Sequence, residues 1–149
     1  MGLTLQGWLR RRDEHGEVNL THWRRLKPFL PNADAVVLSQ EDLDNDLAQA
    51  YEIARYCRLV VVTQGPLGAT VIWCGQKRQF SALQVDQVDP TGAGDIFAAA
   101  FFTQMAGGET AWEAAEFANQ LAADSIRRRG LDGIPSPEWI QAIEQGIGP

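Results

Sequence analysis

Along this chain, short uninterrupted runs of apolar residues alternate with longer stretches in which apolar residues recur every three to four positions. The run 59–63 (Leu-Val-Val-Val-Thr) is uninterrupted and β-branched, which is typical of a strand buried on both faces. The run 33–38 has the same character, and the alternating residues 1–6 predict a third strand. Residues 70–74 and 79–83 alternate on either side of a Gly-Gln-Lys sequence, which predicts a β-hairpin.

Helical spacing with recognisable caps occupies most of the remaining chain. Asn19, Ser39 and Ser136 can each cap a helix that starts after them, and Thr110 with Glu113 has the spacing of a capping box. A further helix follows the glycine-bearing turn near residue 92 and is expected to end at the Gly-Gly pair 107–108. The capped helices are predicted over residues 20–30, 40–57, 110–129 and 137–144.

This alternation of strands and helices, with one hairpin, predicts an α/β layered fold with a mostly parallel sheet. In such sheets ligands bind beyond the carboxyl ends of the strands. Ser39, Thr63 and the loop before Asp95 all follow predicted strands. We therefore expect these three places to meet at one edge of the sheet.

The segment 88–95 (Val-Asp-Pro-Thr-Gly-Ala-Gly-Asp) joins a polar turn to a helix rich in Ala and Phe. The first N–H groups of a helix lack partners within it and, with the helix dipole, favour an anion such as phosphate. Gly92 and Gly94 carry no Cβ, so a ligand can approach the backbone closely. Asp95 beside that anion suits a base that deprotonates an attacking hydroxyl. The structural alternative is that Asp95 serves only as a helix cap or dipole partner.

Two other glycine-rich nucleotide motifs are excluded. A dinucleotide-binding fingerprint needs a third glycine where Phe97 stands. A Walker A loop needs Gly-Lys followed by Ser or Thr, and the chain has no such sequence.

Composition narrows the class of protein. The 149 residues suffice for one modest domain, and 45% hydrophobic with 21% charged residues is ordinary for a globular chain. The net charge of -6 argues against a nucleic-acid partner, and the arginine clusters 10–12, 24–25 and 127–129 are expected on solvated faces.

No apolar stretch is long enough to span a membrane. Cys57 and Cys74 lack metal-ligand spacing and suit reduced thiols in a cytoplasmic protein.

Residues 89–95, followed after three positions by Ala-Ala-Phe-Phe at 99–102, resemble the C-terminal signature of the ribokinase-like (PfkB) carbohydrate kinases. The resemblance implies a layered α/β/α ribokinase-like fold. It also implies transfer of the γ-phosphate of ATP, with Mg²⁺, to a hydroxyl of a sugar or related small molecule. In that chemistry Asp95 would be the catalytic base, and the amides of Gly92, Ala93 and Gly94 would stabilise the developing charge.

The resemblance implies nucleotide contacts outside this signature. Thr63, Gly65 and Gly68 belong to a loop similar to the family's strand-end loop that lies along ATP. Asn119 falls at a polar position near the adenine. The structural alternatives are a plain turn at the entry to the hairpin and a solvent-facing helix residue.

Three further residues match positions around a monovalent cation, often potassium, in the family. These are Asp89, Thr91 and Gly130. Carboxylate and carbonyl oxygens suit such a hard cation. The alternative is that Asp89 simply begins an Asp-Pro turn.

One departure from the family concerns the predicted strand end at residues 39–42. The family often has Asn-x-x-Glu there, which helps to place magnesium and phosphate, whereas this chain has Ser-Gln-Glu-Asp. The acidic role would pass to Asp42 or Glu41. A Ser cap followed by acids in the first helical turn accounts for the same residues without a metal.

A second departure is length. Family members are considerably longer, and their N-terminal half carries a Gly-Gly-Asn substrate motif that this sequence lacks. The resemblance implies that residues 1–149 form the C-terminal, nucleotide-binding part of the domain, with the N-terminal half absent. We expect little sugar kinase activity from this part alone. We also expect association, such as a homo-oligomer, through an exposed sheet edge.

Two other functions remain open from the sequence. The chain could be a non-catalytic nucleotide-binding or interaction module, which the Ser39 departure favours and Asp95 disfavours. It could also be part of a kinase for a vitamin precursor within the same superfamily. Neither the acceptor nor the preferred nucleotide follows from the sequence.

Overall fold

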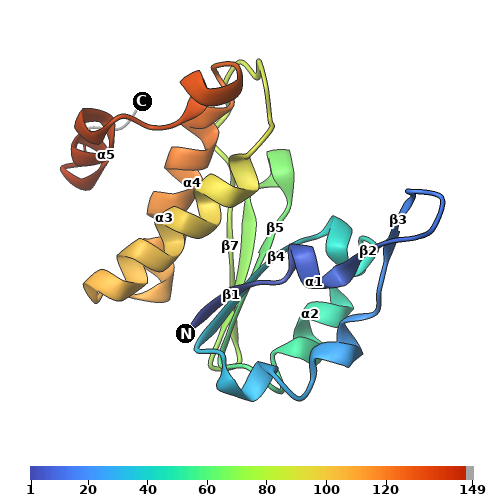
Figure 1. Cartoon of the computed structure of the whole chain (residues 1–149). Helices are drawn as coiled ribbons and strands as arrows, with labels where there is room; N and C mark the ends of the chain where they lie inside the picture. Colours follow the sequence, from blue (N-terminus) through green and yellow to red (C-terminus); the bar gives the residue numbers. More distant parts are fainter. Residues whose placement is uncertain (147–149) are drawn as a thin grey trace. The chain divides into compact units, whose positions relative to one another are not determined.

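The computed structural model describes residues 1–146, which fold into two compact units (Figure 1). The first unit comprises Met1–Gln64 and Thr70–Arg78. The second comprises Gly65–Ala69 and the chain from Gln79 onward. That both units belong to one C-terminal kinase domain stays a prediction.

A five-stranded sheet has the order β1-β4-β5-β6-β7. Its strands are β1 (Gly2–Thr4), β4 (Ala35–Ser39), β5 (Leu59–Thr63), β6 (Ala69–Trp73) and β7 (Gln76–Phe80). Strands β1 and β4, and β4 and β5, pair in parallel, so the expected α/β fold with a mostly parallel sheet is confirmed. The register places Ser39 opposite Thr63, so the carboxyl ends of β4 and β5 coincide.

The core of the first unit lies against one face of this sheet. The first four residues of β4 and of β5 are buried, as their continuous apolar runs predicted. Val36 and Val60 share a hydrophobic cluster with Trp23 and with Ile53 of α2 (Ala48–Ile53). Leu9 of the short α1 (Gln6–Leu9) closes the same cluster. This core fixes where the two strands end.

The helix predicted over residues 20–30 is wrong. The structure has two short 3₁₀ helices instead, η1 (Trp23–Leu26) and η2 (Leu30–Asn32). Pro28 is the reason, because a proline lacks the N–H that an α-helix needs and clashes with the preceding turn. The cap is His22, whose side chain accepts from the Arg24 N–H, rather than Asn19.

The arginine cluster at 10–12 also forms structure that the sequence did not predict. Strand β2 (Arg10–Arg12) pairs antiparallel with β3 (Val18–Leu20) as a separate two-stranded sheet. The turn between them is organised by Asp13, whose carboxylate accepts the N–H groups of His15 and Glu17. This small sheet brings Arg10 to the site described below.

The helix predicted over residues 40–57 is only partly correct. A 3₁₀ turn, η3 (Glu41–Leu43), is followed by Asp44 and Asn45 with φ of +53° and +59°. Asp and Asn tolerate this left-handed conformation better than other non-glycine residues, and it interrupts a helix. The helix restarts as α2 after Asp46, whose carboxylate accepts the Ala48 N–H.

The predicted hairpin is confirmed, with its turn placed earlier. Strands β6 and β7 are joined by Cys74 and Gly75, which have φ of +49° and +80°. Two consecutive residues with positive φ make the type of two-residue turn that matches the twist of the flanking strands. Gln76 and Lys77, which were expected in the turn, are therefore the first two residues of β7.

The second unit is built on α3 (Ala93–Gly107), α4 (Ala111–Ser125) and α5 (Pro137–Glu144). The capping box of Thr110 with Glu113 is present, and Gly108 ends α3 in a left-handed conformation, as predicted. Phe97 and Phe101 of α3 are buried and stacked at 6.2 Å. Helix α3 packs against α4, and α4 contacts α5. This packing fixes the direction of the α3 N-terminus.

Helix α4 ends at Ser125, four residues before the predicted end. The Ile126 carbonyl accepts the N–H groups of Val88 and Asp89 at 2.7 and 3.0 Å, instead of continuing the helix. A 3₁₀ turn, η5 (Gly130–Gly133), follows. The early end of α4 thus anchors the loop that precedes α3.

No helix within residues 1–146 combines the length and the apolar character needed to cross a membrane. Both cysteines are free, Cys57 buried and Cys74 exposed. A cytoplasmic location stays a prediction. Association through a sheet edge also stays a prediction. Outside the sheet, Trp8 and Phe29 are exposed apolar side chains that contact each other edge to face at 5.8 Å.

Candidate functional site

The N-terminus of α3 is an open backbone surface. Gly92 caps the helix with φ of +82°, a conformation that favours glycine. A Cβ built on Gly92 or Gly94 would have no atom of the described chain within 4 Å, apart from its chain neighbours and the nearby helix backbone, so no other part of the chain covers these two positions. Among the described residues, the N–H groups of Gly92, Gly94 and Asp95 have no hydrogen-bond partner. The Ala93 N–H, in contrast, donates to the Pro90 carbonyl at 3.2 Å.

Asp95 lies in the first turn of α3 and is exposed. Within residues 1–146 its carboxylate accepts no hydrogen bond and forms no ion pair, so it does not cap the helix. Three unpartnered N–H groups and one unpaired carboxylate therefore share a single helical turn. Such a turn can bind an anion and accept a proton beside it.

Asp89, Thr91 and Gly130, expected around a monovalent cation, come together in the second unit. The Asp89 carboxylate accepts the Thr91 N–H at 3.0 Å and the Gly130 N–H at 3.1 Å. The Thr91 side chain and these two peptide N–H groups hold the pKa of Asp89 below its ordinary value. These donors make Asp89 a brace between the loop before α3 and the turn after α4. The brace needs no ion, and the potassium role stays a prediction.

The Asp89 brace should weaken only in acid. Because the pKa of Asp89 is lower in the folded state, its stabilisation is complete above the ordinary pKa and is lost as the pH falls through the lowered value. We expect Asp89→Asn to reduce the free energy of unfolding near neutral pH, and the difference from the parent to shrink below about pH 4. Urea unfolding at several pH values measures this difference. Asp86→Asn is the control, because Asp86 is exposed and its side chain has no hydrogen-bond or ion-pair partner among the described residues. A difference that is the same at every pH would contradict the role of the Asp89 charge.

At the carboxyl ends of β4 and β5, a chain of hydrogen bonds joins the two strands. The Gln40 N–H donates to the Thr63 carbonyl at 2.8 Å, and the Thr63 hydroxyl donates to the Leu38 carbonyl at 3.5 Å. The Gln64 amide donates to the Gln40 side chain at 2.7 Å. The expected meeting of Ser39 and Thr63 at one edge is therefore present, within a hydrogen-bonded network.

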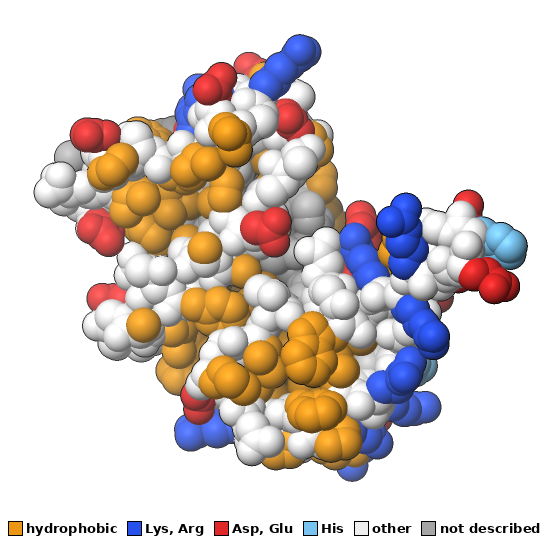
Figure 2. Space-filling model, in the orientation of Figure 1, with side chains coloured by type: hydrophobic (Ala, Val, Ile, Leu, Met, Phe, Trp, Pro, Cys, Tyr) orange, Lys and Arg blue, Asp and Glu red, His pale blue; other side chains and the backbone are white. Residues whose placement is uncertain are grey.

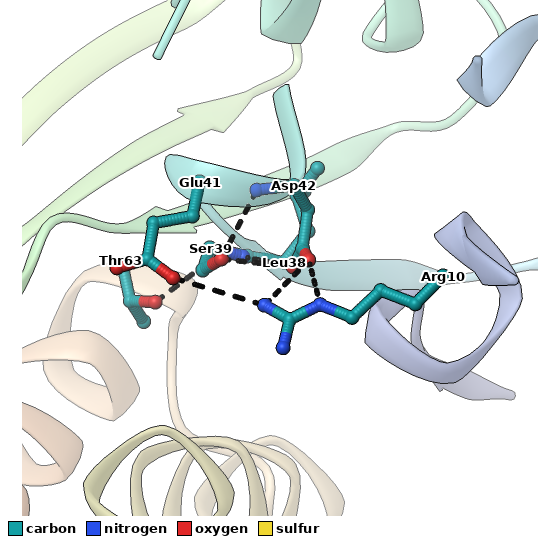
Figure 3. A network of polar contacts seen from close by, with 6 residues as sticks. All are labelled: Arg10, Leu38, Ser39, Glu41, Asp42 and Thr63. Carbon is teal, nitrogen blue, oxygen red and sulfur yellow. Dashed lines mark hydrogen bonds and ion pairs between the residues drawn. The ribbon is translucent and has the colours of Figure 1, made fainter. Parts of the chain in front are cut away.

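Asp42 lies in the same network, as Figure 3 shows. Its side chain is fully buried and forms an ion pair with Arg10 at 3.1 Å. Its other oxygen accepts the N–H and the hydroxyl of Ser39 at 3.0 and 2.9 Å, while the Ser39 Oγ accepts the Asp42 N–H at 3.2 Å. Ser39 and Asp42 thus form a capping box. The magnesium role expected of Asp42 stays a prediction, and its carboxylate is already occupied by protein donors.

Three nucleotide candidates remain, Gly65, Gly68 and Asn119, and two of them have local structural roles. Gly68 is buried with φ of +90°, and a Cβ there would lie 1.9 Å from the Phe80 carbonyl oxygen. Gly65 is exposed with φ of +53° and open space around it. Asn119 is buried rather than solvent-facing, and its amide donates to the Ser81 carbonyl at 2.7 Å. Their contacts with ATP stay predictions.

The structure forms two groups of candidate residues, one in each unit. Ser39, Asp42 and Thr63 are joined in the first, and Asp89, Thr91 and Gly130 are joined in the second. The expected meeting of Asp95 with the first group stays a prediction.

Arg10 is the residue of this site that the sequence analysis missed. Figure 2 shows Lys and Arg side chains gathered along the side of the first unit that carries β2 and β3. Arg11 and Arg12 of β2 are exposed, as expected of a solvated cluster, but Arg10 is half-buried against Asp42. Alternation within a strand turns the Arg10 side chain away from that of Arg11, and of the two arginines on its face, Arg10 is the one that reaches Asp42. That signal becomes visible only once residues 10–12 are assigned to a strand.

Comparisons with known proteins agree with this fold. A family model described as "pfkB family carbohydrate kinase" matches residues 22–139. An inositol 3-kinase of Oryza sativa subsp. japonica is 35% identical over 94 residues, which cover 63% of this chain and 23% of that protein. A fructokinase of Escherichia coli is 38% identical over 92 residues, covering 54% of this chain and 29% of that protein.

A solved structure has the same fold. A ribokinase II-type protein of Escherichia coli, in complex with ATP and Mg²⁺, is 25% identical with a TM-score of 0.68. The match covers 83% of this chain and 42% of that one. The chain thus spans less than half the length of each of these three proteins.

Proposed function

Because this chain belongs to the pfkB family of carbohydrate kinases, we propose that it carries the nucleotide site and catalytic base of a phosphotransferase. The reaction would move the γ-phosphoryl group of ATP to a hydroxyl of a sugar or related small molecule. The chain would be the C-terminal part of that kinase domain. Since it spans under half of its relatives, we propose that the acceptor site needs residues outside it and that this part alone turns over little sugar.

The observation that carries this proposal is the first turn of α3. The N–H groups of Gly92, Gly94 and Asp95 are unpartnered among the described residues, and the Cβ positions of the two glycines have open space around them. These three N–H groups would stabilise the negative charge that develops on the phosphoryl group. The Ala93 N–H already donates to the Pro90 carbonyl, so Ala93 would contribute only to the conformation of the turn. The unpaired Asp95 carboxylate would accept the proton of the attacking hydroxyl.

The remaining candidates would support the nucleotide. The loop with Thr63, Gly65 and Gly68 would lie along ATP, and Asn119 would stand near the adenine. Magnesium would arrive with the nucleotide, since Mg²⁺ is usually held by substrate phosphates and one or two carboxylates, and it would neutralise phosphate charge. The similar ribokinase II-type protein was solved with both ATP and Mg²⁺, which supports their use here. The hydrogen bonds from Thr91 and Gly130 to Asp89 would be kept whether or not potassium is bound.

A matched pair of glycine variants tests the phosphate-binding turn. A Cβ on Gly94 meets no protein atom, so Gly94→Ala should not destabilise the fold, and alanine is the better helix former. The added methyl group would, however, stand where the ligand approaches. We expect Gly94→Ala to weaken ATP binding about tenfold or more, or roughly 1.4 kcal/mol, by calorimetric titration with Mg²⁺ present.

Gly107→Ala is the control for this experiment. Gly107 lies at the other end of α3, also with open space at its Cβ position. It should leave ATP affinity unchanged. Equal ATP affinity in the two variants, or no ATP binding by the parent chain, would contradict the proposed site.

One observation favours the alternative of a non-catalytic nucleotide-binding module. Asp42, where the family often has a glutamate that helps to place magnesium, is fully buried and engaged by Arg10 and Ser39. A binding module would keep the phosphate contacts without needing a base at Asp95. The Asp95 variant discussed below separates the two functions.

A further inference from the structure

The Arg128 side chain links the last turn of α4 to the 3₁₀ turn η5 that follows it. Two nitrogens of its guanidinium group donate to the two carboxylate oxygens of Asp124, at 3.3 and 2.5 Å. Its Nε donates to the Asp132 carbonyl at 2.7 Å. Asp124 is buried, so its carboxylate depends on a partner of opposite charge. One side chain therefore joins α4 to η5 through three hydrogen bonds.

The two neighbouring arginines have no such role. Arg127 and Arg129 are exposed, as expected of a solvated cluster, whereas Arg128 is half-buried. Arg127 lies 3.6 Å from the Asp124 carboxylate, which is too far for a hydrogen bond. The Arg129 side chain has no hydrogen-bond or ion-pair partner among the described residues. Arg128 is thus set apart from its neighbours by geometry and not by residue type.

A close backbone contact holds η5 against α4 at a second point. A Cβ on Gly133 would lie 2.7 Å from the Ser125 carbonyl oxygen, so only glycine fits there without a shift of the backbone. Gly133 is also buried. The turn after α4 is therefore fixed to two successive residues of the helix, Asp124 through the arginine and Ser125 through this contact.

This turn in its turn holds the loop that leads into α3. The Asp89 N–H donates to the Ile126 carbonyl at 3.0 Å, and its carboxylate accepts the Gly130 N–H at 3.1 Å. The same carboxylate accepts the N–H of Thr91, the last residue before the cap of α3. The two residues that hold Asp89 lie on either side of Arg128 in the chain. The conformation that Arg128 imposes between them therefore decides where Asp89 is held.

We propose that Arg128 is a positioning residue of the phosphate-binding turn. By joining Asp124 to the Asp132 carbonyl, it fixes the place of Asp89 and, through Asp89, the direction of the N–H groups at residues 92–95. Because Asp124 balances its charge, Arg128 acts through the geometry of the turn and not through attraction of phosphate. The inference rests on the proposed function only in that the ligand of this turn is a phosphate group of ATP.

The amide signals of residues 92–95 test this positioning without any ligand. Arg128→Lys keeps a positive charge beside Asp124, but one ammonium nitrogen cannot reach both the carboxylate and the Asp132 carbonyl as the guanidinium group does. Arg129→Lys is the matched control, because it makes the same exchange at an adjacent, exposed residue. In the ¹⁵N-labelled chain we expect these signals to shift in Arg128→Lys and to stay at their parent positions in Arg129→Lys. Signals that do not move in Arg128→Lys would overturn the proposal.

ATP affinity measures the size of the effect. The titration is calorimetric, with Mg²⁺ present, at a temperature where the parent and both variants are folded. We expect the dissociation constant to rise about fivefold or more in Arg128→Lys and to stay unchanged in Arg129→Lys. An ion pair that served only stability would lower the melting temperature and leave the affinity of the folded chain as it was. Equal affinity in the two variants would therefore contradict a positioning role.

A double variant tests whether Arg128 acts through Asp89. Asparagine at position 89 presents an NH₂ group where one carboxylate oxygen accepted an N–H, so Asp89→Asn weakens the link by itself. In that background we expect Arg128→Lys to raise the dissociation constant by less than about twofold. If the two single effects simply multiply, the path through Asp89 is wrong.

Two further outcomes are distinguishable. If Arg128→Lys does not fold, the pair Asp124→Asn with Arg128→Gln replaces it, since this pair leaves no buried charge without a partner. We expect from it the same shift of the signals and the same loss of affinity. If the parent chain does not bind ATP, the proposed nucleotide site is wrong, while the amide signals of residues 92–95 still decide whether Arg128 positions the turn.

Discussion

Asp95→Asn should abolish phosphoryl transfer and spare nucleotide binding. A positioned general base contributes about 10²- to 10⁴-fold to rate, so in a kinase that holds this part together with the acceptor site we expect turnover of γ-labelled ATP to fall by that factor. Asparagine has nearly the same shape but cannot accept the proton at this step. Because the substitution also removes a negative charge beside the phosphates, ATP affinity should stay the same or rise. Both quantities are measurable on one preparation, by phosphate transfer or release and by calorimetry.

Asp86→Asn controls for the change in net charge. Asp86 is exposed in the second unit, so its replacement alters charge without touching the first turn of α3. We expect turnover and affinity to match the parent. If Asp95→Asn behaves as Asp86→Asn does, the chain is the binding module rather than the catalytic part. Loss of ATP binding in Asp95→Asn would instead show that the carboxylate has a structural role in the turn.

Gly68→Ala should be the most damaging glycine-to-alanine substitution within residues 1–146. The new Cβ would lie 1.9 Å from the Phe80 carbonyl oxygen and 2.6 Å from the Ala82 nitrogen. Both are backbone atoms, which cannot move aside as a flexible side chain can. The left-handed φ of +90° adds strain for any residue with a side chain. We expect a loss of at least about 3 kcal/mol in the free energy of unfolding, or failure to fold. Urea unfolding followed by circular dichroism measures it.

Gly65→Ala separates backbone strain from collision. Gly65 also has a positive φ, of +53°, but nothing lies within 4 Å of its Cβ position. The expected cost is about 1 kcal/mol, which is the usual penalty for a side chain in the left-handed region. If Gly65→Ala and Gly68→Ala destabilise equally, the close approach of the backbone at residues 80–82 does not explain why position 68 is glycine.

The parts of the fold that could be predicted from the sequence depend on local signals. The run Leu59–Thr63 became β5 without a change of bounds, because a continuous β-branched run carries its own structure. The capping residues Thr110 and Ser136 were found because the hydrogen bond of a cap joins residues three apart. The family signature was equally local, and the match over residues 22–139 confirms it.

The parts that could not be predicted depend on residues far apart in the chain. Arg10 and Asp42 are separated by 32 positions, and no local pattern links them. For Asn119, the solvent-facing alternative to a contact near the adenine is wrong, because its amide donates to Ser81, 38 positions away. The broken helix at Asp44 and Asn45 is a different case, because helical spacing of the apolar residues outweighed the turn preference of two neighbouring polar ones.

Strand β7 has a consequence for the behaviour of the protein at high concentration. It closes one end of the sheet order and reads Gln-Lys-Arg-Gln-Phe, with its first four residues exposed. A second molecule that extended the sheet there would bring Lys77 and Arg78 close to their own copies, and like charges placed side by side repel. Fibril growth is therefore discouraged at this end, and the three-residue β1 at the opposite end offers only a short template for it.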